Sequence, residues 1–328
     1  MLNFSNISLE NFSEAETILR DIGRLIPILQ TSKNTDEILT TKDEISDLSS
    51  RYYEIIPQKA YLHSLVPPIQ HPNALKAAMD LIESLRNIEL ASQLVLGALY
   101  RQAEMHPLDY CYRSLRCEMV PLAKESDEYH LIDQYARAGG CASKIEAIFS
   151  ISREGESERC AKWSLERNKM LLWHGSGLPN FFGILRHGLK IAPPEAPPTG
   201  YMFGKGVYFA DTFSKSYQYT GGLSNRVFML LSEVVLGKMY LRYQSEYVEK
   251  LPEGHLSTKG CGQNGPDMGR SIVLNSGAIV PIGPIIQYPP PDTPEKTYYL
   301  HQNEYIVYDT SQVRLRYLVQ LKTQAEEQ

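Results

Sequence analysis

Cysteine is scarce in this sequence, and its spacing argues against two common structural roles. Only five cysteines occur among 328 residues, and none of them forms a CxxC pair of the kind that binds zinc. An odd number of widely spaced cysteines does not suit a disulfide framework either. We therefore expect free thiols in a reducing compartment. The cysteines are Cys111, Cys117, Cys141, Cys160 and Cys261.

Long apolar runs are missing as well. No stretch approaches the roughly 18 consecutive apolar residues that suggest a membrane-spanning helix. The start of the chain, MLNFSNISLENFSE, has neither the basic region nor the apolar region of a secretory signal. These absences predict a protein without membrane association that is not secreted. We expect a nuclear location if the source is eukaryotic and a cytoplasmic one if it is bacterial.

Basic charge is not concentrated anywhere in the chain. The 33 Lys and Arg residues are scattered among 38 Asp and Glu residues, and the net charge is −5. Nucleic-acid-binding proteins usually carry a concentrated basic face, because neutralisation of phosphates supplies much of their affinity. We therefore expect no direct nucleic-acid binding by this chain. Another module would have to bring it to targets on DNA.

The common phosphate-binding motifs are absent too. The sequence contains no GxxxxGK[S/T] loop, and GKGVYF, its nearest approach to the GxGxxG dinucleotide motif, lacks the third glycine. The alternating βαβ pattern of a dinucleotide-binding domain is also missing. These absences disfavour both a P-loop nucleotidase and a nicotinamide-dependent dehydrogenase.

Helical periodicity dominates the first part of the chain. From Leu75 to about Tyr100, apolar residues recur at steps of three and four, after a candidate N-cap at Asn73. We predict a helical bundle over residues 1–145, whose role is either structural or regulatory. The helices expected within it cover residues 13–29, 42–56 and 73–100.

Strand patterns and long loops take over from about Lys169. In VRLRYLVQL, residues 313–321, apolar side chains alternate with Arg314, Arg316 and Gln320 on the opposite face. Segments rich in Gly and Pro separate the expected strands. The chain is therefore predicted to have an α+β fold, in which a domain of mainly antiparallel β-sheets over residues 146–328 follows the helical bundle.

Three separated segments combine residue types that suit a ligand site. In LLWHGS an apolar run ends at His174 and Gly175, and a glycine lets the backbone approach a planar amide because it has no Cβ. GKGVYFADTFSKSYQY contains Tyr208 and Tyr219, whose phenol rings could enclose a flat ligand. NEYIVYD begins a strand at Glu304, whose carboxylate could bind a hydroxyl and stabilise positive charge. Each residue alone also fits an ordinary structural role.

Together these segments resemble the catalytic domain of the poly(ADP-ribose) polymerases, in the polymer-forming, DNA-damage-responsive branch of that family. The resemblance is nearly word for word over about residues 168–225 and 300–322. It includes GLKIAPPEAPPTGYMFGKGVYFAD and HLSTKG. LSSRYYEIIP and NALKAAMDLIESLRNIELA resemble the helical regulatory subdomain that precedes the catalytic domain in that branch. The resemblance implies an ADP-ribosyltransferase fold after the helical bundle.

The resemblance also implies a catalytic triad of His174, Tyr208 and Glu304. His174 would bind the adenine-side ribose of NAD+. Glu304 would hold the 2′-hydroxyl of the nicotinamide ribose and stabilise the oxocarbenium-like charge as nicotinamide leaves, as carboxylates do in glycosidases. NAD+ would be a consumed substrate, with no recycled cofactor and no metal. The ADP-ribose would pass to protein acceptors, including the enzyme itself, and would be extended into polymer.

Further residues match the substrate-binding positions of the family. The Gly175 backbone and the Ser216 hydroxyl would hold the nicotinamide carboxamide between the rings of Tyr208 and Tyr219, so that nicotinamide mimics would inhibit. Other matches to the NAD+ cleft are Ser176, Asn180, Lys190 and Gly206. Met202, Lys205 and Glu304 match the acceptor side, and Glu83 matches a regulatory contact with the adenosine side.

The sequence departs from the family pattern in a few places. Lys190 stands where this branch commonly has Arg, and Glu83 and Asn87 replace other residues of the regulatory helix. The leading helical segment of the regulatory subdomain is not recognisable, and no DNA-binding module precedes it. DNA-triggered activation of this chain alone is therefore in doubt. The alternatives are a mono-ADP-ribosyltransferase, disfavoured by an acidic residue at position 304, and a non-catalytic module that binds NAD+ or ADP-ribose.

Overall fold

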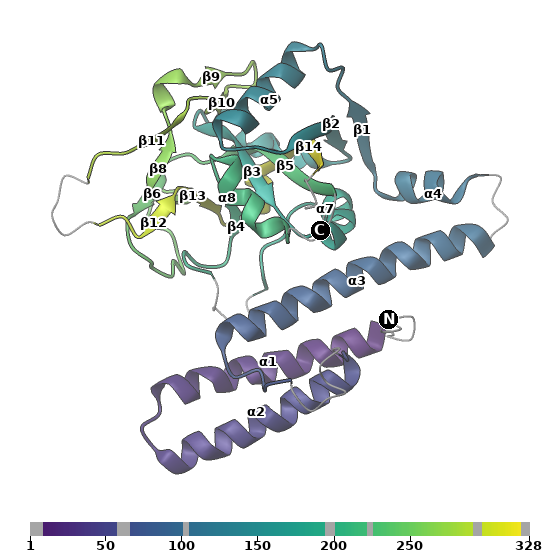
Figure 1. Cartoon of the computed structure of the whole chain (residues 1–328), viewed down its shortest axis with the longest axis vertical. Coiled ribbons are helices and arrows are strands. Elements are labelled where there is room, and N and C mark those ends of the chain that lie inside the picture. The colour runs from purple at the N-terminus through teal and green to yellow at the C-terminus, as the bar shows by residue number, and fades with distance from the viewer. Residues whose placement is uncertain are drawn as a thin grey trace. The chain divides into compact units, whose positions relative to one another are not determined.

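A computed structural model of the chain describes residues 9–57, 66–100, 105–193, 201–221, 226–290 and 297–322. The chain divides into two compact units, which we call the helical unit and the sheet unit. The helical unit is Met1–Gln93 with Ala192–Tyr201, and the sheet unit is Leu94–Ile191 with Met202–Gln328. Figure 1 shows helices α1 and α2 in the first and the β-strands in the second. Helices followed by sheets confirm the predicted α+β class.

The helical unit is built from α1, α2 and most of α3. Apolar faces of these helices share one core, which includes Ile22, Tyr52 and Ile82. Asn34 caps α2, because its side chain accepts hydrogen bonds from the backbone amides of Asp36 and Glu37. All three helices predicted from the sequence are therefore present. Their bounds are Leu9–Thr31 for α1, Thr35–Ile55 for α2 and Pro72–Tyr100 for α3.

The predicted N-cap of the third helix was wrong. Helix α3 begins at Pro72, so Asn73 lies inside it. Proline suits the first helical position, because the amide hydrogen it lacks would have no partner within the helix. The Asn73 amide instead donates to Nδ1 of His71 at 3.2 Å. The His71 imidazole, and not the Asn73 side chain, therefore caps the start of α3.

The sheet unit is organised around a seven-stranded main sheet in the order β1-β2-β14-β5-β3-β10-β9. Its central strands β14, β5 and β3 are joined by antiparallel pairing, whereas β3 and β10 are parallel. The alternating segment expected at residues 313–321 forms β14, which confirms that prediction. The bounds are Cys117–Pro121, Lys144–Arg153, Val313–Lys322, Arg226–Val235, Lys169–Gly175, Ala278–Val280 and Ile272–Val273, in sheet order.

Two smaller sheets complete the unit. The second sheet has the order β4-β13-β7-β6, with bounds Val207–Phe209, Glu304–Val307, Ser257–Gly260 and Met239–Arg242. The third sheet has the order β11-β8-β12, with bounds Ile285–Gln287, Gly262–Pro266 and Leu300–Gln302. Five α-helices lie wholly within the described part of the unit: α4 (Pro107–Ser114), α5 (Asp127–Ala138), α6 (Glu156–Cys160), α7 (Phe181–His187) and α8 (Phe213–Tyr217).

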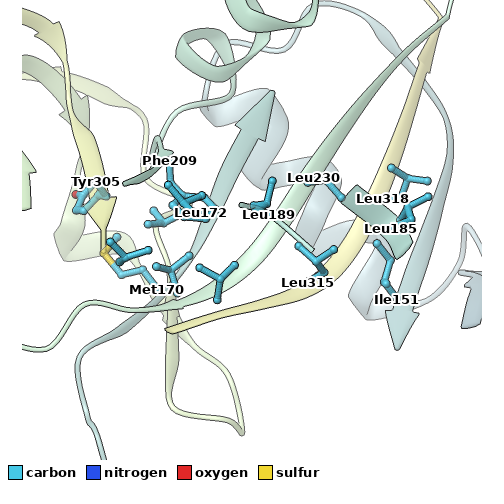
Figure 2. Close-up of a cluster of buried hydrophobic side chains, with 14 of the residues drawn as sticks. Ile151, Met170, Leu172, Leu185, Leu189, Phe209, Leu230, Tyr305, Leu315 and Leu318 are labelled. Carbon is cyan, nitrogen blue, oxygen red and sulfur yellow. The ribbon is translucent and has the colours of Figure 1, made fainter. Parts of the chain in front are cut away.

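Both faces of the main sheet are buried. Along β3, Met170 and Leu172 belong to one core cluster, while Leu171 and Trp173 belong to the other. Figure 2 shows the first cluster, in which side chains of the main sheet meet those of the second sheet, such as Phe209. Because side chains alternate along a strand, His174 lies on the same face as Met170 and Leu172. The strand pattern alone therefore directs His174 toward the second sheet.

Residues before position 145 also contribute to the sheet unit. Strand β1 pairs with β2 along its length. The α5 residues Tyr129, Ile132 and Tyr135 pack in the same cluster as Trp173. The Tyr135 hydroxyl also donates to the backbone carbonyl of Leu171 at 3.0 Å. The domain limits predicted from the sequence, 1–145 and 146–328, remain a prediction.

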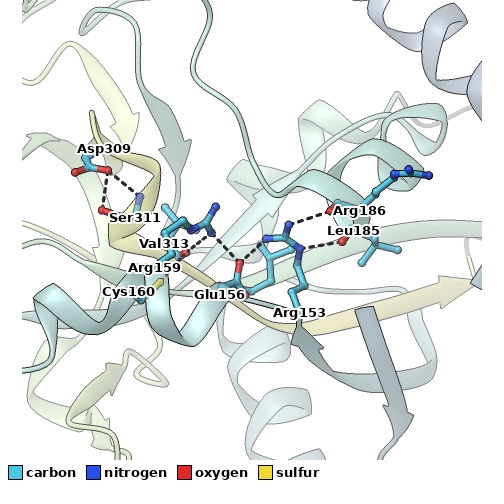
Figure 3. Close-up of polar contacts among 10 residues, drawn as sticks. Arg153, Glu156, Arg159, Cys160, Leu185, Arg186, Asp309, Ser311 and Val313 are labelled. Carbon is cyan, nitrogen blue, oxygen red and sulfur yellow. Dashed lines mark hydrogen bonds and ion pairs between the residues drawn. The ribbon is translucent and has the colours of Figure 1, made fainter. Parts of the chain in front are cut away.

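A buried network of ion pairs joins α6 to the end of α7 and to β14 (Figure 3). The Glu156 side chain is 3% exposed, and its Oε1 lies 2.6 Å from Arg153 Nη1 and 3.0 Å from Arg159 Nη2. Its Oε2 accepts from the Leu315 amide at 3.1 Å. Arg153 in turn donates to the carbonyls of Leu185 and Arg186. Arg153 thus satisfies carbonyl groups that a helix end leaves unpaired.

Candidate active site

The candidate site begins where the main sheet and the second sheet meet. A β-bridge joins Trp173 to Ala210, with their backbone amides and carbonyls paired at 2.8 and 3.0 Å. This bridge brings the end of β3 next to the end of β4. As a result, His174 Nδ1 lies 2.9 Å from the backbone carbonyl oxygen of Tyr208. Two residues of the predicted triad are therefore in direct contact.

The contact with Tyr208 sets the hydrogen-bonding role of the His174 ring. A carbonyl oxygen can only accept, so Nδ1 must carry the hydrogen. Burial lowers the pKa of His174 below its ordinary value, although the bond to Tyr208 opposes this effect. The ring is therefore neutral at pH 7, and Nε2 is an acceptor. Such a nitrogen can receive a hydrogen bond from a sugar hydroxyl.

The predicted carboxamide clamp lies directly beside His174. A Cβ on Gly175 would come within 1.9 Å of the Ser216 carbonyl oxygen, so that only glycine fits there. The Ser216 hydroxyl donates to the Trp173 carbonyl at 2.9 Å and is held against the end of β3. The Gly175 backbone and the Ser216 hydroxyl are thus neighbours, as a clamp on a planar amide requires.

The two predicted tyrosines are held differently. The Tyr208 hydroxyl donates to the Gly204 carbonyl at 2.8 Å and accepts from the Phe203 amide at 3.0 Å. These two bonds fix the orientation of the Tyr208 ring. Tyr219 lies in the short turn after α8 and is 57% exposed. An aromatic face that is open in this way remains accessible to a ligand.

Glu304 begins β13 and is only 7% exposed. Its Oε1 lies 2.7 Å from Nζ of Lys215, which also lies 6.0 Å from the centre of the Tyr219 ring. Burial alone would lower the pKa of Lys215, but the contact with Glu304 raises it overall. Lys215 therefore stays charged and compensates the buried carboxylate.

Lys215 was not predicted as a site residue. The sequence offered one signal, since Lys215 stands between two serines in the SKS segment that carries part of the family resemblance. Its partner Glu304 lies on a strand far along the chain, and this pairing arises only when β13 packs beside β4 and α8. Spacing in the sequence could not reveal that contact.

The structure describes the surroundings of five further predicted residues: Ser176, Asn180, Met202, Lys205 and Gly206. Asn180 Nδ2 donates to the Ser176 hydroxyl at 3.0 Å, which fixes the turn after β3. A Cβ on Gly206 would lie 2.5 Å from Ile306, so that glycine permits the close approach of β13. Met202 packs against a small cluster that contains Ile306. Lys205 is half-buried beside Gly206.

The predicted roles of Lys190 and Glu83 remain predictions. Lys190 is exposed and follows α7. Glu83 is exposed on α3 in the helical unit, and its regulatory contact remains a prediction. Among the described residues there is no group of three or more His, Cys, Asp or Glu side chains arranged to hold a metal ion. All five cysteines are free.

No helix within the described ranges is long and apolar enough to cross a membrane. The site itself combines a neutral imidazole, a glycine–serine pair, two tyrosines and a buried carboxylate at the junction of the main sheet and the second sheet. This arrangement fits the class of ADP-ribosyltransferases that the sequence resembles.

Comparisons with known proteins identify the family. The family model of the poly(ADP-ribose) polymerase catalytic domain matches residues 126–323, and that of the poly(ADP-ribose) polymerase regulatory domain matches residues 2–112. The chain therefore belongs to the poly(ADP-ribose) polymerase family, and the predicted family resemblance is confirmed.

Several curated relatives agree with this assignment. Poly [ADP-ribose] polymerase 2 of Zea mays is 41% identical over 299 residues, which are 88% of this chain and 45% of the relative. Poly [ADP-ribose] polymerase 2 of Arabidopsis thaliana is 39% identical over 88% of this chain and 46% of the relative. Poly [ADP-ribose] polymerase 1 of Gallus gallus is 40% identical over 86% and 28%. The chain thus matches half or less of the length of these relatives.

Proposed function

We propose that the chain cleaves NAD+ at the bond between nicotinamide and ribose, transfers ADP-ribose to protein acceptors including itself, and extends it into polymer. The observation that carries this proposal is the buried Glu304 carboxylate, which is 7% exposed and is paired at 2.7 Å with Lys215, the chain neighbour of Ser216. A carboxylate that is preorganised by an ion pair in a place of low exposure is suited to stabilise a positively charged sugar.

The proposed roles follow from the groups that each side chain offers. The Gly175 backbone and the Ser216 hydroxyl hold the carboxamide, and Tyr208 and Tyr219 contact the nicotinamide ring. The Nε2 atom of His174 accepts a hydrogen bond from a hydroxyl of the adenine-side ribose. Ser176, Asn180, Lys190 and Gly206 line the NAD+ cleft, while Met202 and Lys205 face the acceptor. NAD+ is a substrate that is consumed and not a recycled cofactor.

Glu304 would act on the ribose that loses nicotinamide. As the C1′–N bond breaks, nicotinamide leaves with the bonding electron pair and positive charge develops at C1′ and the ring oxygen. Glu304 accepts a hydrogen bond from the 2′-hydroxyl and stabilises this charge. The acceptor oxygen then forms a bond to C1′ and releases its proton to solvent. Lys215, 2.7 Å from Glu304 Oε1, holds the carboxylate in place until the substrate hydroxyl arrives.

Replacement of Glu304 by Gln provides the direct test. The variant keeps the shape of the side chain but loses its charge, and removal of one preorganised electrostatic group typically costs on the order of 10²–10³ in rate. We expect Glu304→Gln to lose polymer formation. It should still bind benzamide, a nicotinamide mimic with the same planar carboxamide, because Gly175 and Ser216 are unchanged. Labelled NAD+ followed by denaturing electrophoresis measures the product, and the shift in melting temperature measures benzamide binding.

The same assay separates the alternatives. A high smear from the wild-type chain indicates polymer, a sharp shifted band indicates single transfer, and binding without label indicates a non-catalytic module. Glu154→Gln is a matched control, since the Glu154 side chain is 69% exposed. Polymer formation by Glu304→Gln at the wild-type rate would show that the proposed mechanism is wrong.

The wider cellular role rests on the relatives. The relatives named above come from plants and a bird. Because these organisms are eukaryotes, we propose a nuclear location for this chain. Direct nucleic-acid binding by this chain is still not expected, because its net charge is −5.

A further inference from the structure

Asp211 is a buried carboxylate to which the proposed mechanism assigns no role. It follows β4 and is only 1% exposed. Its Oδ2 accepts hydrogen bonds from Asn303 Nδ2 at 2.8 Å and from the Tyr305 hydroxyl at 3.0 Å. These two donors are the immediate neighbours of Glu304 in the chain. A single oxygen atom therefore holds the residues on both sides of the candidate catalytic carboxylate.

Strand geometry gives this contact a consequence for Glu304. Successive side chains of an extended chain point to opposite sides, so Asn303 and Tyr305 share the side that faces Asp211 and Glu304 points away from it. A shift by one residue would turn Glu304 toward the core. Tyr305 is 1% exposed and cannot turn outward without leaving a cavity in the core. Holding both neighbours thus fixes the side on which the Glu304 carboxylate lies.

Asp211 acts where the strand pairing ends. The pairing between β13 and β4 begins at Tyr305, opposite Phe209, whereas Glu304 is paired only with Gly260 of β7. Beyond this last pair, the Asp211 side chain binds the side chains of Asn303 and Tyr305, on either side of Glu304. Asn303 is held from another direction as well, because its Oδ1 accepts from the Gly262 amide at 2.9 Å.

The segment from Asp211 to Lys215 makes a side-chain contact with every residue of the segment from Gln302 to Tyr305. In addition to the contacts of Asp211, Gln302 Nε2 donates to the Ser214 hydroxyl at 2.9 Å and Lys215 pairs with Glu304. Burial raises the pKa of Asp211, while the charge of Lys259 and the hydrogen bonds from Asn303 and Tyr305 oppose that rise. A buried carboxylate is costly to fold unless it is well paired.

The carboxamide clamp is held independently of Asp211. The Ser216 hydroxyl bonds to Trp173 on β3, and the Tyr208 hydroxyl bonds to Gly204 and Phe203. None of these hydrogen bonds passes through Asp211. Loss of the Asp211 contacts should therefore disturb Glu304 and leave the nicotinamide subsite in place.

We propose that Asp211 is a positioning residue, whose hydrogen bonds to Asn303 and Tyr305 hold Glu304 in the orientation that transfer of ADP-ribose requires. The inference rests on the proposed function of Glu304. It predicts that Asp211 affects the chemical step and not the binding of nicotinamide-like ligands.

Kinetics of the full chain test the proposal first. Because a small misplacement of a reacting group can cost up to about 10²-fold in rate, we expect Asp211→Ala to lower kcat by roughly 10- to 100-fold. KM for NAD+ and the affinity for benzamide should stay within about twofold of wild type, since the clamp is intact. Asp211→Asn keeps an acceptor oxygen and should restore most of the turnover.

A control variant separates positioning from a general loss of stability. Gln312→Leu removes two buried hydrogen bonds, to the carbonyls of Val235 and Leu256 at 2.8 and 2.9 Å. It should lower the melting temperature without lowering kcat. Unchanged kcat in Asp211→Ala would overturn the proposal, and so would benzamide affinity that falls in parallel with kcat. Should Asp211→Ala fail to fold, Tyr305→Phe removes one hydroxyl and carries the same expectation in weaker form.

A thermal double-mutant cycle tests the orientation without any activity. Lys215→Met leaves the buried Glu304 carboxylate without its ion pair and should lower the melting temperature of the otherwise wild-type chain. If Asp211 orients Glu304, this loss should be at least halved in an Asp211→Ala or Tyr305→Phe background. Additive losses would contradict the inference. The cycle shows whether Asp211 orients Glu304 even if the wild-type chain transfers no ADP-ribose. In that case only the proposed function would be wrong.

Discussion

At the scale of single residues, His174 makes the stability of the chain depend on pH. Burial lowers its pKa in the folded chain, while an exposed imidazole in the unfolded chain titrates at about 6.5. Below that pH the unfolded chain binds a proton that folded His174 does not take up. The stability that neutral His174 contributes is therefore present above about pH 6.5 and is lost as the pH falls through that value.

The comparison of the wild-type chain with His174→Asn tests this pH dependence. Asparagine does not titrate, so the difference in melting temperature between wild type and variant should shrink as the pH is lowered from about 8 to about 5.5, across the ordinary imidazole pKa. A difference that stays constant over this range would mean that His174 is not held neutral.

Residues differ in how far the sequence alone could reveal them. The positions of His174, Tyr208 and Glu304 were predicted because each stands in a segment whose letters closely resemble the family. Lys215 and Asp211 stand in the same segments, yet their importance comes from contacts with residues 303–305 on a distant strand. A contact of this kind depends on packing, and no local periodicity encodes it.

Among the elements, the network between α6, α7 and β14 shows what a buried charge contributes. Removal of one partner from a buried ion pair typically costs about 3–5 kcal/mol, because the remaining charges lose their compensation. Glu156→Ala leaves Arg153 without its carboxylate partner, so we expect the free energy of unfolding of the sheet unit to fall by about 3 kcal/mol. Trp163 and Trp173 both lie in this unit, and their fluorescence during denaturation with urea measures the change.

The control for this prediction lies two positions earlier. Glu154 is 3.8 Å from Arg116, and their side chains are 69% and 75% exposed. An exposed pair of this kind contributes between about 0 and 1 kcal/mol, so Glu154→Ala should change little. Equal losses in the two variants would show that burial of the Glu156 network does not matter.

The sequence predicted individual helices and strands more reliably than it predicted which of them lie side by side. The three long helices and β14 have strong periodic patterns, and each forms where expected. The order of the main sheet was beyond reach, because β14 lies between β2 and β5 although it is far from both in the chain. The predicted start of α3 was wrong, because Pro72 and Asn73 are both residue types that commonly stand where a helix begins. The helix begins at Pro72, and the His71 imidazole accepts from the Asn73 amide.

For the whole molecule, the helical unit is expected to restrain activity. This expectation comes from the regulatory-domain match over residues 2–112 and from the resemblance at Glu83. Ile22 is fully buried in the core of the helical unit, and truncation of a buried Ile to Ala typically costs about 2–5 kcal/mol. Ile22→Ala therefore loosens this unit without touching the residues of the candidate site.

We expect Ile22→Ala to raise turnover of NAD+ in the full chain, measured with labelled NAD+ at saturating concentration. Leu39→Ala is the matched control, because Leu39 lies on α2 of the same unit but is 55% exposed and should leave turnover unchanged. Benzamide binding shows in both variants that the nicotinamide subsite is still folded. If Ile22→Ala lowers turnover while benzamide still binds, the helical unit supports the catalytic unit and does not restrain it.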